Sequence, residues 1–492
     1  EEGGGGRLGA WARCGQLGAA LCLPLGAGGG EEVMEEVRIV SRLAGPLVVQ
    51  NVLGYSLVIV CVIVTGHYCP GPETERALPL AAIVLSNSLY NVTGLSVIIG
   101  LASTLETYCG HAHANSGGAR SRHLMNGYLA RGTLVCLVAA ALIAVLWTQT
   151  ERLLLFVGQK PSLASLSGKY MVWILPSLFA SAVEECGKRI LQSQNVVLAP
   201  TLVLAAATSA GVATMYCLTA VRGWGLLGVA TGYNVANVLM ALGRTAMVLW
   251  VNYGQGSAFG WVAGRALAQQ AVSGWYHYLQ LGVPAVVQIC SEWWVFEIIT
   301  LLAGLLPKTD VEVASVGVLF QLAAVFYMIP MAVQPAAATR VSNELGALNP
   351  GKAARAAWIC LSIGRSMTVA FAVLLLATRT RVALIFVKGT PRRLGGHPYV
   401  VQRVTEAIPV LAAATLNDGV DGVYNGILRG CGLQGRSAAI NLLSNWGVGL
   451  PLALLLGFVE GQGIVGFWTG MAVSLLVANI TYYVITCRID WE

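Results

Sequence analysis

Two carboxylic acids interrupt the apolar stretch CSEWWVFEII at residues 290–299. Glu292 falls near the middle of a long apolar run, and an ionised carboxylate at the centre of a bilayer costs at least about 2.5 kcal/mol. Such a group persists where it is paired, protonated or exposed to a wet cavity. Glu292 is therefore a candidate functional group. The alternative is a structural role, in which it only forms a hydrogen bond to a neighbouring helix. Glu297 lies about 140° further around a helix, so we expect a supporting role for it.

A second acidic site lies in the glycine-rich stretch LAAATLNDGVDGVYNGILRGCG. Asp418 and Asp421 are three residues apart, so they share one face of a helix. Burial and a neighbouring carboxylate both favour the protonated form of an acid. If an organic cation and a proton bind the same oxygen, each excludes the other, and exchange follows when the protein alternates between two access states. We expect Glu292 and Asp418 to be the exchanging pair, with Asp421 in support or in a hydrogen-bonding role.

Other polar and aromatic groups have more than one interpretation. Trp293 and Trp294 could stack on an aromatic cation, or they could pack between helices. Glu184 and Glu185 are each followed four residues later by a base, Lys188 and Arg189, so helical ion pairs explain them. The alternative is a second proton site in the first half of the chain. We expect His111 and His113, in CGHAHAN, to be solvated in a loop rather than to bind a metal.

Composition assigns these groups to a membrane protein. The chain has 492 residues, of which 56% are hydrophobic and 11% charged, whereas soluble domains have about 25% charged residues. The net charge of +7 is scattered through short loops and forms no patch, so no nucleic-acid partner is expected. No catalytic, metal or nucleotide motif appears, which predicts a non-enzyme without a cofactor. Because the ATP-binding motif GxxxxGK[ST] does not occur, an ion gradient is the expected energy source.

The apolar segments predict an all-α membrane protein with twelve spans. An even number of spans puts both termini on one side of the bilayer. We expect residues 1–41, which are rich in glycine and acids, to be a disordered or interfacial tail. The expected spans are 43–66, 78–102, 124–147, 169–191, 199–220, 226–251, 280–304, 311–335, 356–378, 404–428, 436–458 and 463–487.

The two sets of six spans are copies of each other at a constant offset. GPLVVQ at 45–50 aligns with VPAVVQ at 283–288, which gives an offset of 284 − 46 = 238. Glu106 and Glu344 share this offset, as do GLLGVATG at 225–232 and GIVGFWTG at 463–470. Six plus six helices in one orientation form a parallel repeat about an axis along the membrane normal. The expected parts are an N-lobe at 42–252, a linker at 253–273 and a C-lobe at 274–488.

Several motifs resemble the multidrug and toxic compound extrusion (MATE) family, particularly its plant-type eukaryotic branch. The most specific are SEWWVFE followed by GLLP at 291–307, RVSNELGALNP at 340–350 and GILRGCGLQGRSAAIN at 426–441. The resemblance covers about residues 38–488. It implies two lobes around a central cleft, cytosolic termini, and efflux of organic cations or amphipathic metabolites in exchange for protons.

The resemblance also assigns roles to single residues. It implies that Glu292, before the tryptophan pair, and Asp418, eleven residues before Arg429, take part in proton coupling. Gln321 stands where animal relatives have a third acid, and Tyr327 matches a tyrosine that lines the same lobe. The first span has no counterpart of the aspartate that prokaryotic relatives use.

The expected function is therefore secondary active efflux by a monomer in the vacuolar or plasma membrane. Its partners would be protons, the lipid bilayer and small organic cations or secondary metabolites. Two alternatives remain open. One is a lipid-linked sugar flippase of the same superfamily, which would need a cationic cavity for pyrophosphate. The other is a membrane receptor or scaffold that binds a ligand without moving it.

Overall fold

The structure is a computed structural model that describes residues 29–70, 77–115, 119–253, 268–303, 305–306, 309–388, 398–489 and 491. In this part of the chain every regular element is a helix and no β-strand occurs, as the sequence predicted. The first helix, α2, begins at Gly29. Residues 29–41 of the predicted tail are therefore helical rather than disordered, its interfacial location stays a prediction, and residues 1–28 lie outside the described part.

The elements follow the order of the predicted spans. In the first half they are α2 (Gly29–Tyr68), α3 (Ala77–Leu89), η1 (Tyr90–Leu95), α4 (Ser96–Asn115), α5 (Ala119–Thr148), α6 (Thr150–Phe156), α7 (Pro161–Trp173), α8 (Leu175–Ser193), α9 (Leu198–Tyr216), η2 (Cys217–Val221) and α10 (Leu226–Tyr253). In the second half they are α12 (Trp275–Ala303), α13 (Thr309–Tyr327), η3 (Pro330–Ala332), α14 (Val333–Gly346), α15 (Pro350–Lys388), α16 (Pro398–Gly430), α17 (Gln434–Leu442), η4 (Leu443–Gly449), α18 (Leu450–Leu454), η5 (Leu455–Val459) and α19 (Ile464–Cys487).

These helices make the chain an integral multi-pass membrane protein. Among the described residues, nine helices are long and apolar enough to cross a membrane, and two bent pairs, α7 with α8 and α13 with α14, bring the number to eleven. The predicted span 404–428 lies in α16, which is not among the eleven. Asn417, Asp418 and Asp421 lower the hydropathy of that helix, so the count of twelve stays a prediction.

Two compact units make up the structure, and their bounds differ from the predicted lobes. We call them the C-unit, with residues 1–45, 302–428 and 443–492, and the N-unit, with residues 46–301 and 429–442. All of α12 lies within the predicted second lobe, whereas its residues 275–301 are part of the N-unit. Residues 254–267 of the predicted linker lie outside the described residues, whereas 268–272 are helical.

The repeat is visible in the elements themselves. The π-helical turn η2 at 217–221 has its counterpart in η5 at 455–459, and α10 and α19 begin at 226 and 464, each time at an offset of 238. A π-helical turn holds one extra residue and is rare. The same irregularity at the same offset therefore supports duplication more strongly than shared hydrophobicity does.

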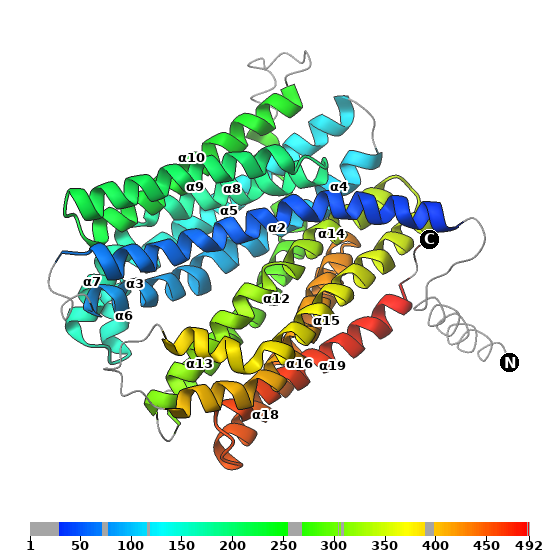
Figure 1. Cartoon of the computed structure of the whole chain (residues 1–492). Helices are drawn as coiled ribbons and strands as arrows, with labels where there is room; N and C mark the ends of the chain where they lie inside the picture. The colour runs from blue at the N-terminus through cyan, green and yellow to red at the C-terminus, as the bar shows by residue number, and fades with distance from the viewer. Residues whose placement is uncertain are drawn as a thin grey trace. The chain divides into compact units, whose positions relative to one another are not determined.

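Equivalent glycines allow the same close helix packing in both halves. In the N-unit, α9 and α10 lie side by side (Figure 1), and a Cβ atom at Gly232 would lie 2.7 Å from the Cα of Met215. In the C-unit, a Cβ atom at Gly470 would lie 2.7 Å from the Cα of Ala453, and both residues are the repeat mates of the first pair. Small residues allow such close backbone approach in membrane helices.

Charged side chains in the N-unit are buried in pairs. Arg189 contacts Glu106 and also lies 3.2 Å from Glu185, while Arg429 lies 3.4 Å from Glu106. Lys188 pairs with Glu185 at 3.0 Å. The predicted pair of Arg189 with Glu185 is therefore confirmed.

Arg244, far along the chain in α10, is the ion-pair partner of Glu184. The predicted pair of Glu184 with Lys188 is therefore wrong. A buried guanidinium that can approach the carboxylate from the neighbouring helix compensates its charge better than a flexible lysine on the helix surface.

The C-unit pairs its buried charges in the same way. Arg340 of α14 lies 2.7 Å from Glu36 of α2 and 2.7 Å from Glu344. Arg403 of α16 lies 2.7 Å from Glu312 of α13. The second carboxylate oxygen of Glu312 accepts a hydrogen bond from the backbone N–H of Ile464, at 3.1 Å. These pairs hold the ends of the helices together.

We predict that Gly470→Ala destabilises the protein by about 1–3 kcal/mol, the usual cost of overpacking, because its methyl group would press on the backbone of Ala453. Gly317→Ala is the matched control, since nothing lies within 4 Å of that position. Thermal unfolding of the purified protein measures both. Equal melting temperatures for the two variants would contradict the packing argument.

We also predict that Arg189→Met lowers stability by about 3 kcal/mol, because it leaves buried carboxylates without their shared cation. Lys188→Met, at a side chain that is 21% exposed rather than 7%, should cost less than about 1 kcal/mol. Denaturant unfolding in detergent distinguishes them. A larger loss for the lysine variant would show that the cluster is not the stabilising element.

Candidate functional site

Helix α16 carries Asp418, and glycines on one of its faces leave that face without side chains. A Cβ atom at Gly419 would lie 2.9 Å from the Cβ of Pro330, and one at Gly426 would lie 3.0 Å from the backbone carbon of Gln334. Only glycine allows η3 and α14 to approach α16 so closely. The sequence spacing of these glycines therefore places the α13–α14 connection directly beside the acid.

The connection between α13 and α14 is bent by 42°. Pro330 has no backbone N–H to donate, so a continuous α-helix is interrupted there. The interruption leaves Tyr327 and Pro330 beside Asp418, because all three residues line the same pocket. A straight helix would carry these side chains past the acid.

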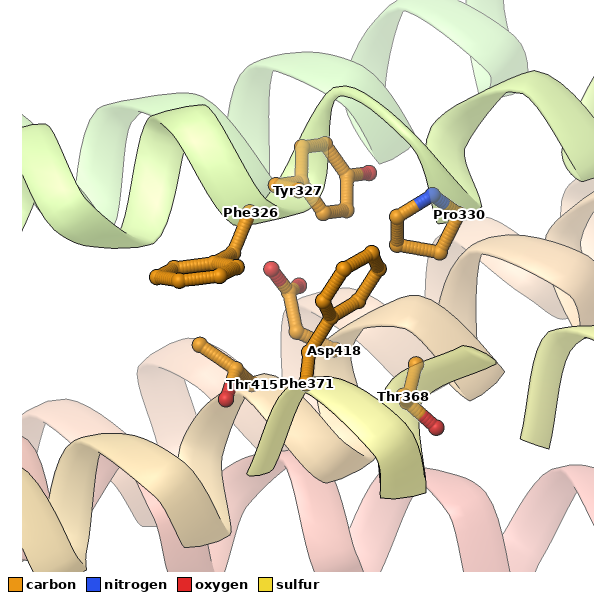
Figure 2. A pocket seen from close by; sticks show the side chains of 7 residues that line it. All are labelled: Phe326, Tyr327, Pro330, Thr368, Phe371, Thr415 and Asp418. Atoms are coloured by element: carbon orange, nitrogen blue, oxygen red, sulfur yellow. The ribbon is translucent and has the colours of Figure 1, made fainter. Parts of the chain in front are cut away.

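Asp418 lines a small pocket in the C-unit, whose empty space is about 220 Å³ with open solvent included. Figure 2 shows its residues, which come from α13, η3, α15 and α16. They are Phe326, Tyr327, Pro330, Thr368, Phe371, Thr415 and Asp418. Asp418 is half-buried and is the one acidic side chain among these residues. Aromatic rings, hydroxyl groups and a carboxylate together form a lining that suits an organic cation or a proton.

Two phenylalanines bring their rings close to the carboxylate. The ring centroids of Phe326 and Phe371 are 5.4 Å apart, and the ring planes are tilted by 54°. In Figure 2 the carboxylate of Asp418 points from α16 toward these rings and Tyr327. Aromatic faces attract cations within about 6 Å, so the rings could add to the attraction of the acid.

Asp421 lies one turn beyond Asp418 and faces a different set of groups. The side-chain amide of Asn425 donates a hydrogen bond of 2.8 Å to Asp421, and Asn425 accepts one of 2.6 Å from the hydroxyl of Tyr482. This chain joins α16 to α19 within the core of the C-unit. The supporting role predicted for Asp421 stays a prediction, and the hydrogen-bonding alternative has a defined geometry.

Glu292 lies on α12 in the N-unit and is 8% exposed. Other residues of α12 contact α4. Tyr278 donates a hydrogen bond to the carbonyl of Leu101 at 2.8 Å, Cys290 lies 3.5 Å from Ser96, and a Cβ atom at Gly100 would lie 2.6 Å from Val286. Glu292 is thus held on a helix that is anchored at several points along its length.

Trp294 takes part in that anchoring. Its indole N–H donates a hydrogen bond of 3.0 Å to the carbonyl of Val92 in the π-helical turn η1. The packing interpretation of Trp294 therefore has a specific partner, whereas Trp293 is half-buried on the same helix.

The remaining predicted residues are distributed over both units. Gln321 lies on α13, half-buried, and does not line the described pocket. Glu297 is half-buried on α12. His111 and His113 belong to helix α4 and not to a loop, and the His111 ring lies 3.2 Å from the carbonyl of Gly430. The structure thus brings Asp418 and Tyr327 together, while Glu292 and the tryptophans belong to the N-unit.

The sequence did not indicate Phe326, Thr368, Phe371 or Thr415. Each is a common residue inside an apolar span, where lipid-facing and pocket-facing positions have the same composition. A signal existed only for Phe326, which directly precedes the predicted Tyr327.

Comparisons with known proteins agree on the family. The family model MatE matches residues 46–217 and 284–455. The two matches are related by 284 − 46 = 238 and 455 − 217 = 238, the offset that the repeat showed.

Among curated relatives from Arabidopsis thaliana, Protein DETOXIFICATION 16 is 31% identical over 467 residues, which cover 94% of this chain and 90% of the relative. Protein DETOXIFICATION 1 is 31% identical over 461 residues, covering 93% and 91%.

Solved structures give the same result. The crystal structure of the eukaryotic MATE transporter AtDTX14 matches with a TM-score of 0.81 and 26% identity, over 93% of this chain and 97% of that one. A MOP superfamily transporter from Pyrococcus furiosus shares the fold, with a TM-score of 0.76 and 16% identity, over 92% of this chain and 95% of that one. The resemblance seen in the motifs is confirmed, and the chain belongs to the MATE family of membrane transporters.

Proposed function

We propose that this protein is a secondary active exporter that exchanges protons for organic cations or amphipathic metabolites. The observation that carries the proposal is the pocket in the C-unit, where a half-buried carboxylate meets aromatic rings. A carboxylate in such a place binds either a proton or a cation at the same oxygen atoms. That competition couples the movement of one to the movement of the other.

Glu292 and Asp418 are the proposed exchanging groups, each on a helix that its neighbours hold in place. Tyr327 would shape the pocket beside Asp418, whereas Gln321, Glu297, Asp421, Trp293 and Trp294 would support the two acids. The energy source is then a proton gradient, with no cofactor. The pocket leaves little room for an organic molecule, so cargo binding would require a wider state than this one.

A sugar-lipid flippase is less well supported. Recognition of a pyrophosphate requires cationic side chains, and the residues that line the described pocket include an acid and no base. We further propose that the termini lie in the cytosol and that the protein functions in the vacuolar or plasma membrane as a monomer.

We predict that Glu292→Gln and Asp418→Asn each reduce proton-driven efflux to the level of protein-free vesicles, because an amide cannot bind and release a proton there. Uptake of a fluorescent cation into proteoliposomes with an acidic interior measures this. Glu406→Gln is the control, since it alters an acid on α16 that is 44% exposed and should leave uptake unchanged. Normal pH dependence in either test variant would refute its role.

We predict that Phe371→Leu raises the half-saturating concentration of a quaternary cation about fivefold, in line with a cation–π contribution of about 1 kcal/mol. The control is Phe458→Leu, because Phe458 contacts Phe467, which is not among the pocket residues. Transport kinetics of both variants provide the test. Equal changes would indicate a general effect of removing a ring from the C-unit.

A further inference from the structure

Gln288 is a fully buried polar residue. Neither the nitrogen nor the oxygen of its side-chain amide has a hydrogen-bond partner among the residues that the structure describes. A buried amide loses its hydration, and without partners nothing compensates that loss. The position therefore calls for a polar group from a ligand or from water.

The repeat supplies an internal comparison, because Gln288 is the mate of Gln50 at the offset of 238. Gln50 donates to the carbonyl of Val197 at 3.2 Å and to the hydroxyl of Thr201 at 2.9 Å. It also accepts a hydrogen bond from Arg244 at 3.4 Å. In the first half this glutamine is thus a structural residue with every polar group used.

The second half has lost the side chains that would play the same part. The positions 238 residues after Thr201 and Arg244 are Ala439 and Tyr482. Alanine has no hydrogen-bonding side chain, and the hydroxyl of Tyr482 donates to Asn425. The glutamine was kept in the second copy although its structural partners were not.

Gln288 lies one helical turn before Glu292, on the same face of α12. Other residues of this face are apolar and buried, namely Ala285, Val295 and Ile299. Groups at i and i+4 have Cβ atoms about 5–6 Å apart. An amide and a carboxylate at that separation are close enough to contact two polar groups of one small ligand.

We propose that Gln288 and Glu292 together bind organic cations that carry a hydroxyl group a few bonds from the charged nitrogen. Glu292 attracts the nitrogen, and the Gln288 amide both donates to and accepts from the hydroxyl. The inference rests on the proposed cation transport and adds a preference within that class of cargo. Gln288 thereby distinguishes hydroxylated cations from purely alkyl ones.

The test uses trimethylammonium ions with a chain of two, three or four carbons that ends in a hydroxyl or in a methyl group. Their charge is permanent, so pH does not change the probe. Each competes with labelled tetraethylammonium for uptake by proteoliposomes containing the full-length protein. The wild type should favour the hydroxyl member of the best pair about fivefold, the usual effect of one hydrogen bond. Gln288→Met, which keeps the volume and removes the amide, should abolish that preference.

A structural role for Gln288 would give a different pattern of stability. Removal of a polar group that lacks partners is neutral or stabilising, so Gln288→Met should melt no lower than the wild type. Gln50→Met, the repeat mate, should melt several degrees lower because it loses three hydrogen bonds. A marked loss of stability for the Gln288 variant would overturn the proposal.

The remaining outcomes separate this inference from the proposed function. If the wild type transports the cations in response to pH but shows no hydroxyl preference, a buried water alone satisfies Gln288 and the inference is wrong. If no cation moves in response to pH, the proposed function fails first. If the preference persists in Gln288→Met, another residue is responsible and the assignment to Gln288 is refuted.

Discussion

The free-energy cost of moving a charged side chain out of water constrains this structure more than any other interaction. Charged side chains are rare in the chain, and most of the described buried ones meet an opposite charge. Arg189 joins Glu106 and Glu185, Arg340 joins Glu36 and Glu344, and Arg403 joins Glu312. Breaking such a pair leaves an uncompensated charge in a medium that cannot solvate it. These pairs connect helices that lie far apart in the sequence, so the same constraint that limits charge also fixes the packing.

Asp418 lines a pocket in the C-unit. The pocket residues beside it are aromatic or carry hydroxyl groups, and the bend at Pro330 holds them there. Close packing at Gly419 keeps the bend against α16. The residues that line the pocket beside this acid are aromatic rings, a proline and hydroxyl groups. These surroundings suit the exchange that we propose for Asp418.

The sequence predicted the helices and the repeat and indicated candidate acids, because each of these leaves a local signal. Apolar runs predict spans, and a constant offset identifies duplication. An acid in an apolar run is recognisable because burying it costs free energy. Contacts between residues that are distant in the sequence leave no such signal. Arg244 pairs with Glu184 from sixty residues away, where Lys188 was expected, and Phe371 resembles any other residue of an apolar helix. The grouping of α12 with the N-unit likewise depends on contacts such as Trp294 with Val92, which no periodicity encodes.

Duplication gives each half the same helical framework, so differences between repeat mates carry information that neither half holds alone. Where a contact is preserved, as at Gly232 and Gly470, both copies serve the packing. Where one copy keeps a polar residue and loses its partners, as at Gln50 and Gln288, stability no longer explains the second copy. A polar group kept in an apolar membrane interior at a cost to stability is best explained by a ligand that compensates the cost when it binds. Where the two repeat mates keep the same contact, the residue stabilises the helical framework. Where only one mate keeps its partners, as at Gln50, we infer that the other mate serves cargo selection.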